Sequence, residues 1–129
     1  MNRGEKYMIK YLTLIILALS LTALPQHNAY SMVDSIQKNI IFQAKGKTVK
    51  PLFSDGFKVA GIGLKKGQML EKHSTPEPAF LFIYQGKVEY RTAAMTHTLN
   101  AGDFIKIQPK EEHEIQAIKD SRLILVKQN

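Results

Sequence analysis

Short runs of β-branched and aromatic residues follow one another along the chain after residue 38, and polar turn residues separate them. Runs of this length and composition are typical of β-strands, whereas an amphipathic helix repeats its apolar residues every three or four positions. The separators contain glycine, asparagine or aspartate, which suit tight turns. The pattern predicts strands at residues 39–43, 48–53, 57–64, 79–84, 87–92, 95–99, 104–107, 114–118 and 122–126.

Nine short strands without helical periodicity indicate an all-β barrel or sandwich. The polar segment 31–37 is expected to be a loose arm without a helix. In the run 87–91, charged residues alternate with apolar ones, so one face of that strand should meet water. The run 79–84 shows no such alternation and is apolar on both faces.

The first 31 residues have the organisation of a secretory signal peptide. Three basic residues among the first ten precede an apolar stretch at 11–24, and small residues near position 30 suit cleavage before Met32. The apolar stretch is shorter than the ~20 residues that span a bilayer, which disfavours an uncleaved anchor. We therefore expect export to a bacterial periplasm or secretion, without stable membrane insertion after cleavage.

Removal of residues 1–31 would leave 98 residues, enough for one domain. It would lower the formal net charge from +7 to +5, because this segment carries three basic residues and one glutamate. The remaining lysines are scattered and lack arginine clusters or interleaved aromatics, so no nucleic-acid partner is expected. The chain has no cysteine, which excludes a disulfide framework and a lipid-modified cysteine.

Two histidines stand at fixed distances after glycines at predicted turns. His73 follows Gly67 by six positions and precedes Gly86 by thirteen, and His113 follows Gly102 by eleven. No Ser/His/Asp arrangement, glycine-rich phosphate loop or catalytic cysteine pattern is present, so nucleophilic and nucleotide chemistry have no support.

This spacing resembles the cupin superfamily. The first cupin motif is glycine, five residues, His-x-His, three or four residues, glutamate, six residues and glycine; the second runs from a glycine through a proline and a glycine to a histidine. Gly67, His73, Gly86, Gly102 and His113 fall in register with these motifs. The chain departs from them at Thr75 in place of the second histidine, Ala79 in place of the glutamate, Gln108 in place of the proline and Lys110 in place of the glycine.

The resemblance implies a jelly-roll β-barrel over residues 58–127, preceded by an arm and first strands at 32–57. It implies that His73 and His113 are neighbours at the barrel mouth, and the strand that begins at His113 should direct that side chain inward. The family register points the side chains of Ala79, Leu81 and Ile83 inward. The other face, which carries Phe80, Phe82 and Tyr84, then needs cover. We expect a homodimer to supply it, with the N-terminal arm folding back as the alternative.

Neutral imidazoles are common ligands of divalent metals, so His73 and His113 are candidate ligands for iron, manganese, zinc, nickel or copper. Glu77 could complete a set of two histidines and one carboxylate, although a solvent-facing charge is its alternative role. Met69 and Glu71 are further nearby candidates. The alternative to a metal centre is a metal-free pocket with hydrogen-bonded histidines. His97 is expected to be a structural or surface residue.

Three functions remain open, and the sequence leaves open whether the protein is an enzyme. The preferred one is a small exported cupin that binds a small molecule, with His73, Thr75 and His113 at the mouth of an apolar cavity. The second is a metal-dependent oxygenase, isomerase or lyase, and the third is a non-catalytic interaction protein. The cavity lining expected for the first is Leu81, Ile83, Ile105, Ile107 and Ile115.

Overall fold

The computed structural model describes residues 33–129, of which residues 34–129 form one compact unit. The predicted signal peptide lies outside the described residues. Within them, no helix is long and apolar enough to cross a membrane.

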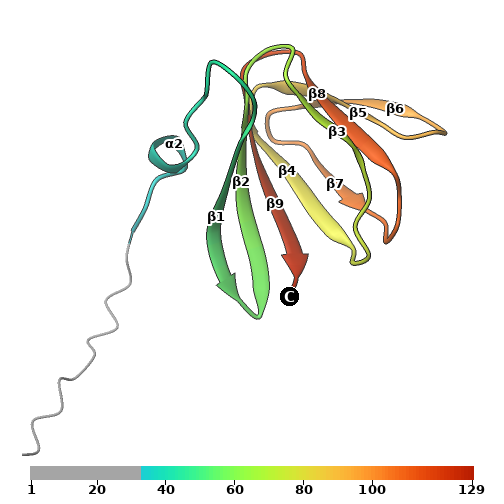
Figure 1. Cartoon of the computed structure of the whole chain (residues 1–129), viewed down its shortest axis with the longest axis horizontal. Coiled ribbons are helices and arrows are strands. Elements are labelled where there is room, and N and C mark those ends of the chain that lie inside the picture. Colours follow the sequence, from blue (N-terminus) through green and yellow to red (C-terminus); the bar gives the residue numbers. More distant parts are fainter. Residues whose placement is uncertain (1–32) are drawn as a thin grey trace, which may run out of the picture. The chain divides into compact units, whose positions relative to one another are not determined.

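Two antiparallel β-sheets form this unit, with an α-helical turn before them (Figure 1). The five-stranded sheet has the order β1-β2-β9-β4-β7, and the four-stranded sheet has the order β3-β8-β5-β6. The all-β jelly-roll fold expected from the sequence is confirmed. The bounds are α2 Ile36–Asn39, β1 Thr48–Asp55, β2 Phe57–Leu64, β3 Met69–His73, β4 Ala79–Gln85, β5 Lys87–Arg91, β6 Thr96–Asn100, β7 Phe104–Ile107, β8 His113–Ala117 and β9 Ser121–Gln128.

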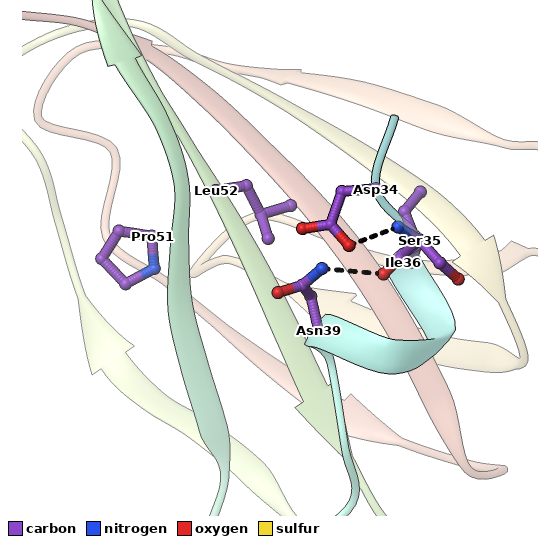
Figure 2. Close-up of a pocket in the computed structure, with 6 residues that line it drawn as sticks. All are labelled: Asp34, Ser35, Ile36, Asn39, Pro51 and Leu52. Atoms are coloured by element: carbon purple, nitrogen blue, oxygen red, sulfur yellow. Dashed lines mark hydrogen bonds between the residues drawn. The ribbon is translucent and has the colours of Figure 1, made fainter. Parts of the chain in front are cut away.

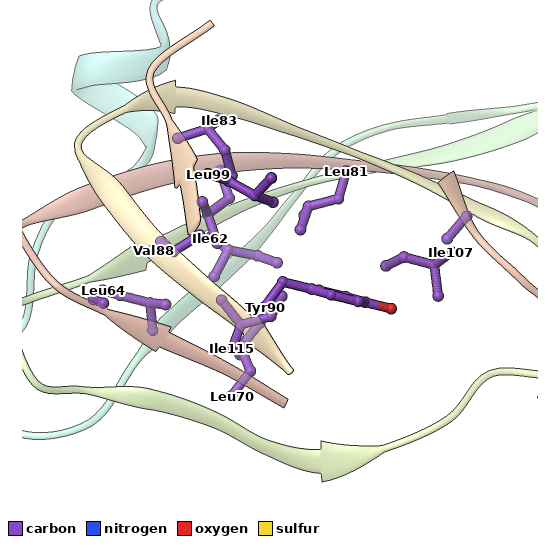
Figure 3. Packing of buried hydrophobic residues seen from close by; sticks show 13 residues of the cluster. Ile62, Leu64, Leu70, Leu81, Ile83, Val88, Tyr90, Leu99, Ile107 and Ile115 are labelled. Carbon is purple, nitrogen blue, oxygen red and sulfur yellow. The ribbon is translucent and has the colours of Figure 1, made fainter. Parts of the chain in front are cut away.

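The core lies between the two sheets, and strands β2 to β9 all contribute to it (Figure 3). The inward direction of Ala79, Leu81 and Ile83 on β4 is confirmed, because all three are buried. Each fully buried aliphatic side chain stabilises the fold by about 1.5–3 kcal/mol. The cluster consists of Ile62, Leu64, Leu70, Ala79, Leu81, Ile83, Val88, Tyr90, Leu99, Ile107, Ile115, Ala117 and Leu123.

Three features of the secondary structure differ from the sequence prediction. Residues 39–43 are not a strand, and the segment before them is not wholly loose, because Ile36–Asn39 form the single turn α2. Strand β3 was not predicted. It contains no β-branched residue and two charged ones, and it forms because it pairs with β8, where Leu70 lies opposite Ile115.

Residues 34–43, here called the N-terminal arm, pack on the outer face of the five-stranded sheet. Ile40 is fully buried there. The arm can approach because Gly61 has no side chain: a Cβ at that position would lie 2.3 Å from Ile40 Cδ1. Arg122 secures the arm, since its Nε donates to the Ile40 carbonyl at 2.7 Å and its guanidinium lies 4.2 Å from the centre of the Phe42 ring.

The arm covers part of the apolar face that the sequence predicted on β4. Gln37 Nε2 donates to the hydroxyl of Tyr84 at 2.6 Å, while Phe80 at the other end of β4 stays 41% exposed. The arm was expected as the alternative cover for this face of β4. It covers the Tyr84 end and leaves Phe80 exposed. A cavity beside α2 has a volume of about 340 Å³. Figure 2 shows its lining residues, Asp34, Ser35, Ile36, Asn39, Pro51 and Leu52.

Candidate functional site

His73 and His113 lie opposite one another on adjacent strands. His73 ends β3 and pairs in register with His113, which begins β8. Their ring centroids are 4.4 Å apart. His113 is only 3% exposed, whereas His73 is exposed. The expectations that these histidines are neighbours and that His113 faces inward are confirmed, and the pair spans the boundary between core and solvent.

The backbone fixes the protonation pattern of both rings. His73 Nδ1 lies 2.8 Å from the carbonyl oxygen of Glu71, and His113 Nδ1 lies 2.9 Å from that of Glu111. A carbonyl oxygen can only accept, so each Nδ1 carries the proton. In the neutral rings each Nε2 then holds a free lone pair, which can accept a hydrogen bond or bind a metal.

Two further residues belong to the site and were missing from the sequence prediction. The ring of Tyr90 on β5 stacks on His113, with centroids 5.2 Å apart. Its hydroxyl donates to Glu111 Oε1 at 2.6 Å. Glu111 thus holds Tyr90 through its carboxylate and His113 through its carbonyl. The signal in the sequence was the inward direction of Tyr90 on an alternating strand, because a buried tyrosine hydroxyl needs a partner.

Burial sets the direction of the pKa shifts at the site. Burial lowers the pKa of His113 below its ordinary value and His73 acts in the same direction, against the opposing effect of Glu111. Burial, and then the hydrogen bond to Glu111, raise the pKa of Tyr90 above its ordinary value. Near neutral pH, His113 is therefore a neutral acceptor and Tyr90 a neutral donor.

Thr75 and Glu77 lie in the loop between β3 and β4. The Thr75 hydroxyl donates to the carbonyl of Glu77 at 2.9 Å, so its proton is used within the loop. The Thr75 carbonyl accepts from the backbone N–H of Lys110 at 2.7 Å, which ties this loop to the turn before His113. Lys110 stands where the cupin motif has a glycine and adopts φ of 62°, the left-handed conformation that glycine favours.

The described residues do not fit a three-ligand metal centre. Within residues 33–129, no group of three His, Cys, Asp or Glu side chains is arranged to hold a metal ion. Catalytic zinc and facial-triad iron need three protein ligands, and the two histidines supply two. Glu71 is engaged elsewhere, because its carboxylate pairs with Lys47. His97 is exposed on β6, in agreement with its expected surface position.

The apolar residues expected to line a cavity are mostly packed core. Leu81, Ile83, Ile107 and Ile115 are at most 2% exposed, and Ile105 is partly buried against them. A cavity of about 340 Å³ borders His73 and is lined by Lys47, Leu70, Glu71, Lys72 and His73. This cavity therefore reaches His73 along β3.

Known proteins share this architecture at low sequence identity. The conserved SPY1581 protein of unknown function from Streptococcus pyogenes is 20% identical, with a TM-score of 0.69 over 78% of this chain and 89% of that one. An RmlC-like cupin from Desulfovibrio desulfuricans is 16% identical, with a TM-score of 0.63 over 81% and 96%. KdgF from Halomonas is 17% identical, with a TM-score of 0.61 over 68% and 84%.

No curated protein matches the chain in sequence. The family model described as the cupin domain matches residues 62–127, a range that extends from β2 to β9 and includes both histidines. The chain therefore belongs to the cupin domain family.

Proposed function

We propose that this protein is an exported cupin that binds a small polar molecule through His73 and His113 without a metal. The observation that carries the proposal is the engagement of both Nδ1 atoms by backbone carbonyls. This arrangement leaves two Nε2 lone pairs on rings whose centroids are 4.4 Å apart.

The free Nε2 atoms define the chemistry of the ligand. Within residues 33–129, no buried side-chain nitrogen or oxygen lacks a hydrogen-bond partner. In His113 the backbone carbonyl of Glu111 engages Nδ1, so Nε2 is the ring nitrogen that remains for a ligand. Two acceptors beside the carboxylate of Glu111 favour a molecule that donates, such as an amino alcohol, a diamine or a polyol. A carboxylate or phosphate would meet no donor at the two Nε2 atoms, and the donors beside them are the ammonium groups of Lys47 and Lys72 in the cavity that borders His73.

The test is a binding screen by thermal shift, followed by isothermal titration calorimetry. Ethanolamine, putrescine and glycerol serve as donor-bearing probes, and acetate and inorganic phosphate serve as acceptor probes. We expect binding within the donor set, weakened at least about tenfold by His73→Ala or His113→Ala, since each substitution removes one hydrogen bond to a polar ligand. His97→Ala is the control for the loss of an imidazole, because His97 is exposed on β6 and lies opposite Tyr90 rather than in the histidine pair.

Two results would contradict the proposal. The first is binding of the acceptor probes in preference to the donors, or donor binding that His73→Ala and His113→Ala leave unchanged. The second is near-stoichiometric iron, manganese, zinc, nickel or copper in protein purified without chelator, lost in both histidine variants and retained in His97→Ala. That second result would support the metal-dependent enzyme instead.

A further inference from the structure

Met95 and His97 bring a sulfur and a ring nitrogen together away from the histidine pair. Met95 Sδ and His97 Nε2 lie 2.8 Å apart. Both side chains are exposed, and Met95 is 52% exposed. Thioether sulfur and imidazole nitrogen are both metal ligands, and the thioether is the softer of the two. This pair therefore presents two ligand atoms to solvent.

The strand places the two side chains on one face. Met95 comes directly before β6, His97 is the second residue of β6, and side chains two positions apart point to the same side of a strand. His97 lies opposite Tyr90 in the pairing of β5 with β6, so it shares the face that carries Tyr90. Because β6 is an edge strand of the four-stranded sheet, solvent reaches the pair from the open edge.

Thr92 holds the turn that carries Met95. The Thr92 hydroxyl accepts from the backbone N–H groups of Ala94 at 3.3 Å and of Met95 at 3.2 Å. The backbone N–H of Thr92 donates to the Met95 carbonyl at 2.9 Å. These bonds close the tip of the hairpin formed by β5 and β6 (Figure 1). They fix the backbone of Met95, while its unbranched side chain keeps three rotatable bonds.

The contact between sulfur and nitrogen can open to admit an ion. A thioether sulfur has no proton to donate, so His97 Nε2–H is the donor in this contact. A neutral imidazole can carry its proton on Nδ1 instead, which frees the Nε2 lone pair for a metal. Backbone positions two apart in a strand are separated by about 6.6 Å, so rotation of the Met95 side chain can move its sulfur away from the nitrogen.

We propose that Met95 and His97 bind one soft monovalent cation, Cu(I) or its analogue Ag(I). Thioether ligands select Cu(I), and imidazole also suits copper. Zinc takes three or four protein ligands, more than this pair supplies. The chain has no cysteine, and the other methionine in the part that the structure describes, Met69, is only partly exposed on β3. Met95 is therefore the exposed sulfur ligand of residues 33–129.

Isothermal titration calorimetry with silver nitrate in chloride-free buffer tests the site. We expect Ag(I) to bind with a dissociation constant that rises at least about tenfold in Met95→Leu and in His97→Ala, because each substitution removes a ligand. Met69→Leu is the matched control, since it removes a methionine at the opposite edge of the same sheet and should leave the affinity unchanged. Cu(I) should give the same order in anaerobic competition with bicinchoninate, and Zn²⁺ should bind at least about 100-fold more weakly than Ag(I).

Carbon-13 spectra supply a second readout. Ag(I) should shift the methyl signal of Met95 and the ring signals of His97, and it should leave the Met69 methyl signal in place. All three substitutions should preserve the thermal unfolding midpoint, because Met95 and His97 are exposed and leucine retains the apolar bulk of Met69.

The new site and the histidine pair can fail separately. His73→Ala should weaken the binding of the donor-bearing probes and keep Ag(I) at Met95 and His97, whereas His97→Ala should do the reverse. Wild-type protein that binds no Ag(I) would overturn the proposal, as would equal effects of Met95→Leu and Met69→Leu. Ag(I) that is lost in His73→Ala and kept in His97→Ala would assign the ion to the histidine pair, and Zn²⁺ bound as tightly as Ag(I) would contradict a soft site.

Discussion

His113 gives the site a pH dependence whose sign follows from its burial. Burial lowers the pKa of His113 in the folded protein, so the unfolded chain binds more protons as the pH falls below about 6.5. The stabilisation is therefore complete above the unfolded pKa and is lost as the pH falls through the lowered folded pKa. We expect the free energy of unfolding to decrease between about pH 7 and pH 5.

Urea denaturation across this range measures the effect. His113→Gln should flatten the dependence because the titrating group is gone, whereas His97→Gln should retain it because His97 is exposed. A wild-type profile parallel to that of His113→Gln would show that the burial of His113 does not control its protonation.

The site residues differ in how far the sequence could predict them. The resemblance of the spacing of His73 and His113 to the cupin motifs was sufficient to predict that the two side chains are neighbours. The bond between Tyr90 and Glu111 was not predictable, because it joins residues 21 positions apart across a strand pairing. The alternation of apolar and charged residues along β5 indicates that Tyr90 points inward. It does not identify which carboxylate accepts the hydrogen bond from the hydroxyl.

The N-terminal arm holds its place on the sheet mainly through one side chain. Ile40 is fully buried against the bare backbone at Gly61, while the next residue, Ile41, is 58% exposed. Ile40→Ala should lower the free energy of unfolding by about 2–4 kcal/mol, because it leaves a cavity under the arm. Ile41→Ala should change it by less than about 0.5 kcal/mol.

Chemical denaturation checks both values, and hydrogen exchange of the arm amides shows whether the arm detaches. Equal effects of the two substitutions would contradict the assigned packing.

At the level of elements, the sequence predicted the strands that carry their own pattern. Each of the eight strands predicted after residue 47 overlaps an observed strand and agrees within two residues at either end. Strand β3 and helix α2 were missed for different reasons. The sequence Met69-Leu-Glu-Lys-His73 becomes a strand through its partner β8, and a single helical turn is too short to show a period.

Across the whole molecule, the two sheets have different outer faces. On the four-stranded sheet, Arg91 donates to Glu114 at 3.2 Å and to Gln116 at 2.8 Å, and it also pairs with Glu89. These polar side chains bond to one another, so this outer face can stay in contact with water. The five-stranded sheet is apolar on both faces, and the arm covers part of the outer one. Beyond the arm, Phe53, Phe80 and Phe104 stay exposed on this sheet.

Export of the protein is a further prediction, and it depends on the predicted signal peptide at residues 1–31. Expression of residues 1–129 in a bacterium with a general secretion pathway should yield a periplasmic or secreted species that begins at Met32, because an apolar stretch at 11–24 follows a basic segment. Leu17→Arg should block processing, since an arginine in an apolar segment costs about 2.5–3.5 kcal/mol on insertion.

Asn2→Arg is the matched control, because it adds the same charge where the predicted signal is already basic and should leave export intact. Intact-mass spectrometry of the cell fractions distinguishes the outcomes. An uncleaved chain retained in the cytoplasm would contradict export, whereas an uncleaved chain in the membrane fraction would identify residues 11–24 as an anchor. This sequence contains no cysteine, so an oxidising compartment would add no disulfide to it.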